Sequence, residues 1–105
     1  MSAVPTSDLK TYKKRPALVV QSDDLTTEFH QRIVVQITSN LDRKGETRIL
    51  VPSNSLQGRS MGLRMDSVIV VDNLVTVMER ELDRRLGNCP NMQPVEEALR
   101  KTLGL

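Results

Sequence analysis

Residues 67–78 of the chain are SVIVVDNLVTVM, two runs rich in β-branched residues with only Asp72 and Asn73 between them. Such runs favour β-strands. The first run, 67–71, shows no clean alternation of apolar and polar residues, which indicates a strand covered on both faces. We therefore predict two nearly continuous strands, at 67–71 and 74–78.

Shorter runs of the same kind come earlier in the chain, separated by polar stretches, two of which contain glycine. The predicted strands are 16–21 (PALVVQ), 33–38 (IVVQIT) and 47–51 (TRILV), and the predicted loops are 41–46 and 56–62. Pro16 is tolerable only at the start of its strand, because proline has no N–H for the ladder. Several short strands at this spacing suggest a β-sandwich or barrel.

The pattern changes to a helical one after Met78. Leu82 and Leu86 lie four residues apart and Gly87 follows them, so we predict a short helix over 79–86.

A second helix is predicted at the C-terminal end. Asn91 is its expected N-cap, Pro94 lies in its first turn, and Gly104 ends it. Its apolar stripe, which we expect to pack on the sheet, consists of Val95, Ala98, Leu99 and Leu103.

Composition is that of a globular protein: of 105 residues, 38% are hydrophobic and 27% charged, which is enough for one domain. The net charge of +2 permits nucleic-acid binding without requiring it. A basic cluster of Lys10, Lys13, Lys14 and Arg15 fits either a nucleic-acid contact or a solvated strand edge. Tyr12 and Phe29 are the only aromatic residues, so binding that depends mainly on base stacking is disfavoured.

The rare residue types exclude several kinds of site. Cys89 is the only cysteine, which excludes an internal disulfide. His30 is the only histidine, so one chain cannot assemble a Cys/His zinc site, and we interpret His30 as a surface loop residue. No run approaches the roughly 18 apolar residues of a membrane span, and we expect a cytoplasmic protein. These patterns predict a small β-rich domain with a C-terminal helix, and they name no activity.

Five stretches, in order, resemble the MazF/PemK toxin family. KKRPALVV at 13–20 is similar to that family's Arg-Pro strand, and IVVQITSN at 33–40 is similar to the strand that ends in Thr-Ser. The others are Gly62-Leu63 before Asp66-Ser67, DNLVTV at 72–77 and LRKTLGL at 99–105. The resemblance spans about residues 8–105, and it is the order and spacing of these pieces that carry it.

The resemblance implies one MazF/PemK-like domain over residues 1–105, with an SH3-like β-barrel, a C-terminal helix and dimerisation across a sheet. It also implies a toxin of a type II toxin–antitoxin system that cleaves single-stranded RNA or mRNA without a metal or other cofactor. A ribose 2′-OH would attack the neighbouring phosphate and leave a 2′,3′-cyclic phosphate and a free 5′-OH. The implied protein partner is a cognate antitoxin whose tail covers the RNA groove.

Two residues match the family's catalytic positions. By this match Arg15 would stabilise the charged phosphate and help to protonate the leaving 5′-oxygen, and Thr38 would hydrogen-bond the scissile phosphate. Lys13, Lys14 and Ser39 are the expected RNA-binding residues. The general base is left unassigned, and Asp72 is interpreted as a structural residue that holds a turn.

The chain departs from the family pattern at its start. The family begins with a longer strand, whereas residues 4–9 resemble only the tail of that strand and its loop. A truncated first strand would expose apolar surface and an unpaired sheet edge. This departure leaves open an inactive toxin-derived SH3-like module that binds RNA or antitoxin without cleavage. Gyrase binding, which similar folds carry out in other toxins, is a third possibility.

Overall fold

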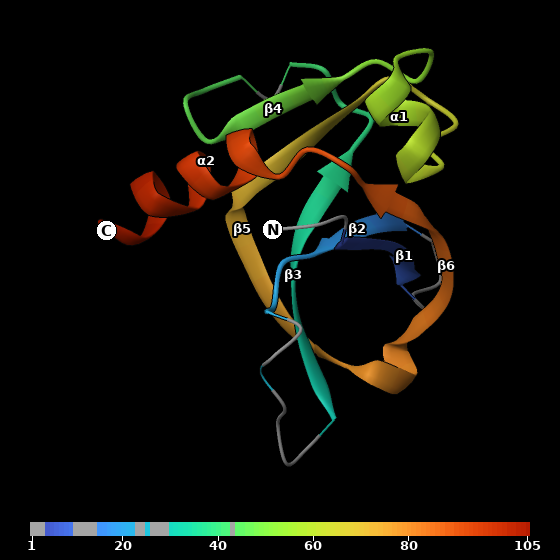
Figure 1. Ribbon diagram of the computed structural model, residues 1–105, viewed down its shortest axis with the longest axis vertical. Helices are drawn as coiled ribbons and strands as arrows, with labels where there is room; N and C mark the ends of the chain where they lie inside the picture. The colour runs from blue at the N-terminus through green and yellow to red at the C-terminus, as the bar shows by residue number, and fades with distance from the viewer. Residues whose placement is uncertain (1–3, 10–14, 23–24, 26–29, 43) are drawn as a thin grey trace.

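The computed structural model describes residues 4–9, 15–22, 25, 30–42 and 44–105, with the backbone alone for 4–9 (Figure 1). Its elements are β1 (Val4–Leu9), β2 (Arg15–Val19), β3 (Gln31–Thr38), β4 (Arg48–Val51), α1 (Leu56–Met61), β5 (Ser67–Met78), the 3-10 turn η1 (Glu79–Glu81), β6 (Leu82–Cys89) and α2 (Gln93–Leu103). The predicted class, mainly β with a C-terminal helix, is confirmed. None of the helices in the described ranges is long and apolar enough to cross a membrane.

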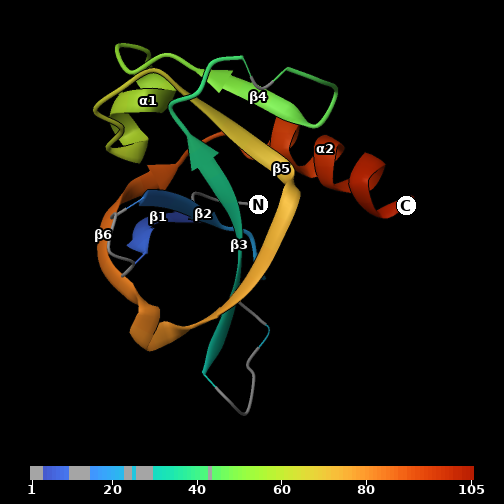
Figure 2. The same cartoon turned by 180° about the vertical axis from the view of Figure 1, so that it is seen from behind.

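The strands form a six-stranded sheet in the order β4-β5-β3-β2-β1-β6. Every strand pair in the described part of the chain is antiparallel. The sheet curls strongly: β5 arcs away from β4 into η1, and β6 returns to lie beside β1 (Figures 1 and 2). The helix α2 contacts β5 and β4, while α1 contacts β6. The curled sheet thus has its two edges at β4 and β6 and is not closed.

The first strand is short, as the sequence predicted, but the expected unpaired edge at this strand is wrong. Thr6 of β1 pairs with Leu18 of β2 on one side and with Gly87 of β6 on the other. β1 is therefore an inner strand, because six residues are sufficient to hydrogen-bond both neighbours. The exposed edges of the sheet belong to other strands.

The two strands predicted at 67–71 and 74–78 are one strand, β5, with a bulge in its middle. Gln36 of β3 pairs with Val70, whereas the preceding Val35 pairs with Leu74, so residues 71–73 lack partners on β3. Such an insertion bends a strand and increases its twist. The Asp72-Asn73 pair therefore marks the bend of a continuous strand.

Asp72 is structural, but it holds no turn. Its two carboxylate oxygens accept hydrogen bonds from Nε and a terminal nitrogen of Arg48, at 2.8 and 3.0 Å. This bidentate pair ties β4 to the bent part of β5. Next to it, the Asn73 side-chain amide donates to Oε1 of Gln36 at 2.7 Å and links the bulge to β3.

The core has two parts, one on each face of the curled sheet. The larger part lies beneath α1 and α2, and it includes Leu18, Ile37, Met61, Ile69 and Val95. The smaller part lies on the opposite face and consists of Ala17, Val19, Val34 and Val77, with Leu82 packed against it. Residues 68–71 of β5 are all buried, which confirms that this run is covered on both faces.

The predicted helix over 79–86 is wrong. Glu79–Glu81 form a single 3-10 turn, and the chain then continues as β6, paired with β1. The spacing of Leu82 and Leu86 suits a strand as well as a helix, because an interval of four residues is also a multiple of two. Pairing with β1 supplies the long-range hydrogen bonds that local spacing does not reveal.

The predicted loop at 56–62 is also partly wrong, since residues 56–61 form α1. Ser55 caps this helix: its Oγ accepts a hydrogen bond from the N–H of Gly58 at 3.0 Å. Gly62 ends the helix in the left-handed region with φ of 73°. Glycine inside this short segment made the sequence look like a loop.

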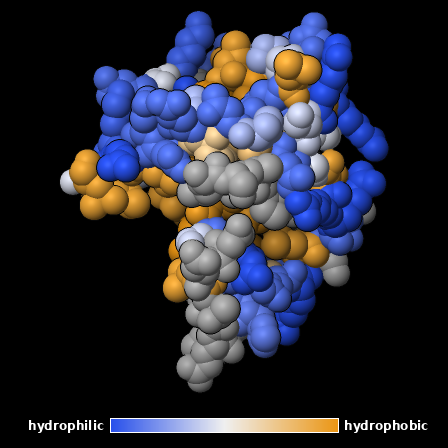
Figure 3. Space-filling view, viewed as in Figure 1, coloured by the Kyte–Doolittle hydropathy of each residue, from blue (hydrophilic) through white to orange (hydrophobic). Residues whose placement is uncertain are grey.

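The C-terminal helix is present, with differences at both ends. Its N-cap is Met92, one residue later than predicted, although Asn91 Oδ1 still accepts from the N–H of Gln93 at 3.2 Å. Val95 and Ala98 pack in the core as expected. Leu103 is 56% exposed and does not pack on the sheet. A hydrophobic patch is visible at this end of α2, where Leu105 is exposed as well (Figure 3).

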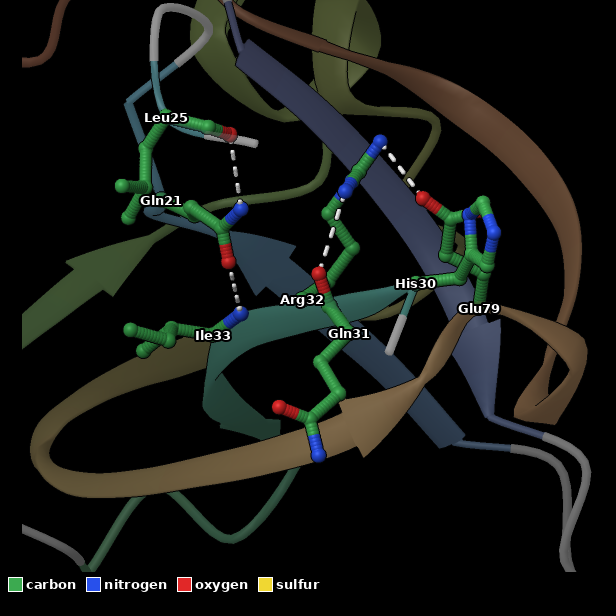
Figure 4. A network of polar contacts seen from close by, with 7 residues as sticks. All are labelled: Gln21, Leu25, His30, Gln31, Arg32, Ile33 and Glu79. Atoms are coloured by element: carbon green, nitrogen blue, oxygen red, sulfur yellow. Dashed lines mark hydrogen bonds and ion pairs between the residues drawn. The ribbon is translucent and has the colours of Figure 1, made fainter. Parts of the chain in front are cut away.

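Polar contacts fix the beginning of β3, far along the strand from Thr38 (Figure 4). The buried Gln21 side chain donates to the carbonyl of Leu25 at 3.2 Å and accepts from the N–H of Ile33 at 3.1 Å. Arg32 pairs with Glu79 at 2.7 Å, which joins β3 to η1. His30 is exposed at the surface, as predicted, with its imidazole 3.9 Å from Glu79.

The Arg48–Asp72 pair leads to a prediction about stability and pH. The hydrogen bond from Arg48 lowers the pKa of Asp72, so the pair adds stability above the unfolded pKa and loses it as pH falls through the folded pKa. Asp72→Asn should reduce the free energy of unfolding at pH 7, and its deficit should shrink between about pH 5 and about pH 3. Urea denaturation of the wild-type chain and the variant at pH 7 and at pH 3 measures the two free energies of unfolding.

Asp42→Asn serves as the control, because Asp42 is an exposed carboxylate without an ion-pair partner among the described side chains. It should change stability little at either pH. An equal deficit for Asp72→Asn at pH 7 and pH 3 would contradict the ionic role of Asp72.

Candidate functional site: an arginine-lined pocket

A pocket of about 470 Å³ lies where β2 begins and β3 ends. Two further segments complete it, the loop between α1 and β5 and the middle of β6. The lining residues are Arg15, Pro16, Ile37, Thr38, Ser39, Gly62, Leu63, Arg64, Met65, Ser67, Arg84 and Leu86. Residues from four separate parts of the chain therefore meet at one concave surface.

One wall is built by the β2–β3 ladder. Ala17 pairs with Gln36 and Leu18 pairs with Val35. Continuing the same antiparallel register by two residues puts Arg15 directly across from Thr38. Side chains that face each other in this way lie close enough to contact one ligand.

Thr38 and Ser39 follow this wall out of the strand. The Thr38 hydroxyl oxygen accepts a hydrogen bond from the N–H of Asn40 at 3.1 Å. Because that contact uses a lone pair, the hydroxyl proton remains available for an acceptor in the pocket. Ser39 is exposed at the pocket rim, while Ile37 is buried in the core below it.

The opposite wall is the loop over residues 62–66, which is anchored at both of its ends. Leu63 N–H donates to the carbonyl of Gly58 at 3.0 Å, and Ser67 Oγ donates to the carbonyl of Met65 at 2.8 Å. The Asp66 carboxylate accepts from the N–H and the hydroxyl of Ser53, at 2.8 and 3.1 Å. Between these anchors the side chains of Arg64 and Met65 are exposed.

Close backbone packing holds this loop against β6. A Cβ at Gly62 would overlap the carbonyl oxygen of Leu86, and one at Gly87 would overlap the carbonyl oxygen of Ser60. Only glycine permits backbones to approach in this way, and Gly62 also has the positive φ that glycine tolerates. The two contacts fix the distance between the loop and β6, and hence the width of the pocket.

The pocket is cationic. Three arginines line it, Arg15, Arg64 and Arg84, and none of its described lining side chains is a carboxylate. Arg15 and Arg64 have no ion-pair partner among the described side chains. A concave surface with one sign of charge concentrates ligands of the opposite sign, and guanidinium groups suit phosphates in particular. The arrangement can bind a phosphodiester and stabilise added negative charge on it.

Two reactive residues lie away from this pocket. Cys89 is completely buried, and burial raises the pKa of its thiol. Its sulfur instead contacts the side-chain amide of Gln57 at 2.9 Å. His30 lies at the other end of β3. Neither residue is placed to act on a ligand of the pocket.

Three of the five predicted site residues come together in the pocket: Arg15, Thr38 and Ser39. The other two, Lys13 and Lys14, lie outside the described residues. Sequence analysis missed Arg64 and Arg84. Arg84 belongs to β6, which the sequence analysis assigned to a helix, and the shift in the β1–β6 register at Leu86 means that simple strand alternation would not have placed it either.

The fold and the site together define a class: a small β protein with a curled antiparallel sheet, a C-terminal helix and a cationic pocket at its strand ends. Comparison with known proteins gives the family. Residues 1–103 match the PemK-like, MazF-like toxins of type II toxin–antitoxin systems, and the chain belongs to this family.

The relatives agree with this assignment. The chain is 32% identical over 105 residues to endoribonuclease MazF6 of Mycobacterium tuberculosis, covering 96% of this chain and 88% of that protein. Endoribonuclease MazF2 of Mycobacterium bovis is equally similar, at 32% identity over the same shares of both chains.

Solved structures share the fold. The Mycobacterium tuberculosis toxin MazF-mt6 has a TM-score of 0.78 at 24% identity, covering 96% of this chain and 97% of that one. A chain of the MazE–MazF crystal structure from Deinococcus radiodurans has a TM-score of 0.76 at 18% identity, covering 100% of this chain and 96% of the other. The predicted MazF/PemK fold is thereby confirmed.

The contact between Gly62 and Leu86 gives a second prediction. Gly62→Ala should lower the free energy of unfolding by about 3 kcal/mol, because the new methyl group adds a backbone clash to an unfavourable positive φ. Gly104→Ala is the matched control, since Gly104 has φ of 72° and open space where a Cβ would be. It should cost only about 1 kcal/mol. Equal losses in chemical denaturation would show that the loop and β6 are not in close contact.

Proposed function

We propose that the arginine-lined pocket is the active site of a metal-independent endoribonuclease that cleaves single-stranded RNA. The observation that carries the proposal is that Arg15 and Thr38 line one pocket, at the end of the β2–β3 ladder. Relatives that are 32% identical over nearly the whole chain are named endoribonucleases. Family membership and this juxtaposition together support the same chemistry.

The reaction needs no nucleophile from the protein. The 2′-oxygen of a ribose attacks the adjacent phosphorus and loses its proton to a base, while the bond between phosphorus and the 5′-oxygen breaks. The leaving 5′-oxygen takes up a proton. The products are a 2′,3′-cyclic phosphate and a 5′-hydroxyl, so protons balance and no water is consumed.

Arg15 has the chemistry for the charged stage of this reaction. Negative charge grows on the phosphate oxygens as the fifth bond forms, and a guanidinium offers two parallel N–H donors to them. The same guanidinium would help to protonate the leaving 5′-oxygen. A guanidinium is a poor base because its pKa is far above neutrality, so the base is a different group.

Thr38 supplies a hydroxyl donor to the scissile phosphate, since its oxygen already accepts from Asn40 N–H. Ser39, beside it at the rim, offers a second hydroxyl to the RNA backbone. Lys13 and Lys14 directly precede Arg15 in the sequence, and their charges would strengthen binding of the RNA backbone.

The partners follow from the same family. We propose a cognate antitoxin as the protein partner, since one related structure is an endoribonuclease in complex with its cognate antitoxin from a mycobacterial species. A homodimer and a cytoplasmic location complete the proposal. An antitoxin segment that covers the arginine-lined pocket would block RNA from it.

The test is cleavage of a long single-stranded RNA in excess EDTA, with the cut ends mapped chemically. The wild-type chain should leave cyclic phosphates, and Arg15→Ala should slow cleavage by about 10²-fold or more while binding is largely retained. Thr38→Val should also slow cleavage, whereas Thr38→Ser keeps the hydroxyl and should retain most activity.

Arg100→Ala is the control, since Arg100 is an exposed residue of α2 outside the pocket. It should cleave at the wild-type rate. A wild-type chain that binds RNA but never cuts it would identify a binding module instead of an enzyme, and an effect on DNA supercoiling alone would point to gyrase.

A further inference from the structure

We infer that Arg64 and Arg84 bind a second phosphate of the RNA, next to the scissile phosphate that Arg15 and Thr38 hold. The inference rests on the proposed function for the location of the scissile phosphate. It gives a function to the second wall of the pocket, which is formed by the loop over residues 62–66 and by β6.

The pocket is larger than one phosphate requires. Its volume of about 470 Å³ falls within the range of sites that hold a whole small-molecule ligand. The β2–β3 wall brings one arginine and two hydroxyl groups, and these suffice for a single phosphodiester. The loop and β6 then bring two more arginines from separate elements.

Arg64 lies on a loop that is held firmly at both ends. The hydrogen bonds of Leu63, Ser67 and Asp66 use backbone, hydroxyl and carboxylate groups, and none of them involves the Arg64 guanidinium. The next residue, Met65, is 62% exposed. An anchored backbone that presents at a pocket a cation without an ion-pair partner among the described side chains suits an anion, because the loop itself need not be ordered on binding.

Arg84 and Leu86 of β6 both line the pocket, at a shift in the β1–β6 register that falls between Arg85 and Gly87. The contact of Gly62 with Leu86 places the end of the Arg64 loop directly against this part of β6. Arg64 and Arg84 thus share one wall even though 20 residues separate them in the sequence. Met65 and Leu86 supply apolar surface beside the two charges, suited to a ribose or a base.

An ordinary solvated arginine would not show this arrangement. Arg59 and Arg100 are exposed on α1 and α2, and neither lines the pocket. When a cation contacts a phosphate, counterions are released from the RNA. Each such phosphate therefore contributes about 0.7 to the slope of log K against log salt for binding to single strands. This quantity separates a phosphate contact from a residue that only maintains the fold.

The experiment measures binding of a 2′-O-methyl RNA oligonucleotide, which cannot be cleaved, at several salt concentrations. Arg64→Gln and Arg84→Gln should each weaken binding about threefold to tenfold and reduce the slope of log K against log salt by up to about 0.7, because the two arginines share one phosphate. Arg64→Lys keeps the charge and should restore the slope. Arg100→Gln should match the wild-type chain.

A second set of oligonucleotides locates the contact. Each carries one neutral methylphosphonate in place of a phosphate, and the replacement is moved along the strand. At the phosphate that Arg64 holds, Arg64→Gln should cause no further loss of affinity, because the two changes remove the same interaction. At all other positions the two losses should add.

These outcomes are distinguishable from failure of the proposed function. If the slope changes and one methylphosphonate position is non-additive, but the wild-type chain never cleaves RNA, the second phosphate site stands and the proposed endoribonuclease activity fails. A chain that cleaves RNA, with slopes unchanged in Arg64→Gln and Arg84→Gln, would overturn the inference. Additive losses at every methylphosphonate position would overturn it as well.

Discussion

The pairing of β3 on both sides, with β2 and with β5, is the constraint from which the pocket follows. Its register with β2, extended by two residues, puts Arg15 across from Thr38, and its register with β5 pairs Thr38 with Val68. A shift of one residue in either ladder would turn the Thr38 side chain to the other face of the sheet. The buried residues on both faces of β3 make such a shift costly, because it would exchange core and surface side chains.

The other half of the pocket depends on the bend in β5. Residues 71–73 bulge out of the ladder with β3, and the strand curves towards η1, from which β6 returns to β1 (Figure 2). Because of this path, Arg84 and Leu86 lie at the pocket, beside the start of β2 and the end of β3. Gly62 and Gly87 then allow α1 and its loop to pack directly on the β6 backbone. A charged pocket thus forms from segments that a local pattern would not associate.

How far the sequence predicts this structure depends on whether a feature is local. The β-branched runs of β2, β3 and β4 and the apolar stripe of α2 are local patterns, and each gave an element near its observed bounds. The β6 strand was mistaken for a helix because Leu82 and Leu86 fit both periods, and only pairing with β1 decides between them. Likewise Asp72 resembled a turn residue, whereas its partner Arg48 comes from 24 positions earlier in the chain.

The candidate site divides in the same way. Arg15, Thr38 and Ser39 were found because they belong to stretches that resemble a known family. Arg64 and Arg84 carry no such signal, and their significance comes from the curvature that brings them to one wall. With two aromatic residues in the whole chain, binding of the proposed RNA substrate must depend chiefly on charge and hydrogen bonds. The pocket offers these groups on two rigid walls.

The most direct test of the central claim is the structure of this chain bound to a 2′-O-methyl RNA oligonucleotide. The account predicts one phosphate in the pocket with its oxygens within hydrogen-bonding distance of both the Arg15 guanidinium and the Thr38 hydroxyl. An oligonucleotide bound on another surface, such as the β4 edge or α2, with the arginine-lined pocket empty, would contradict it.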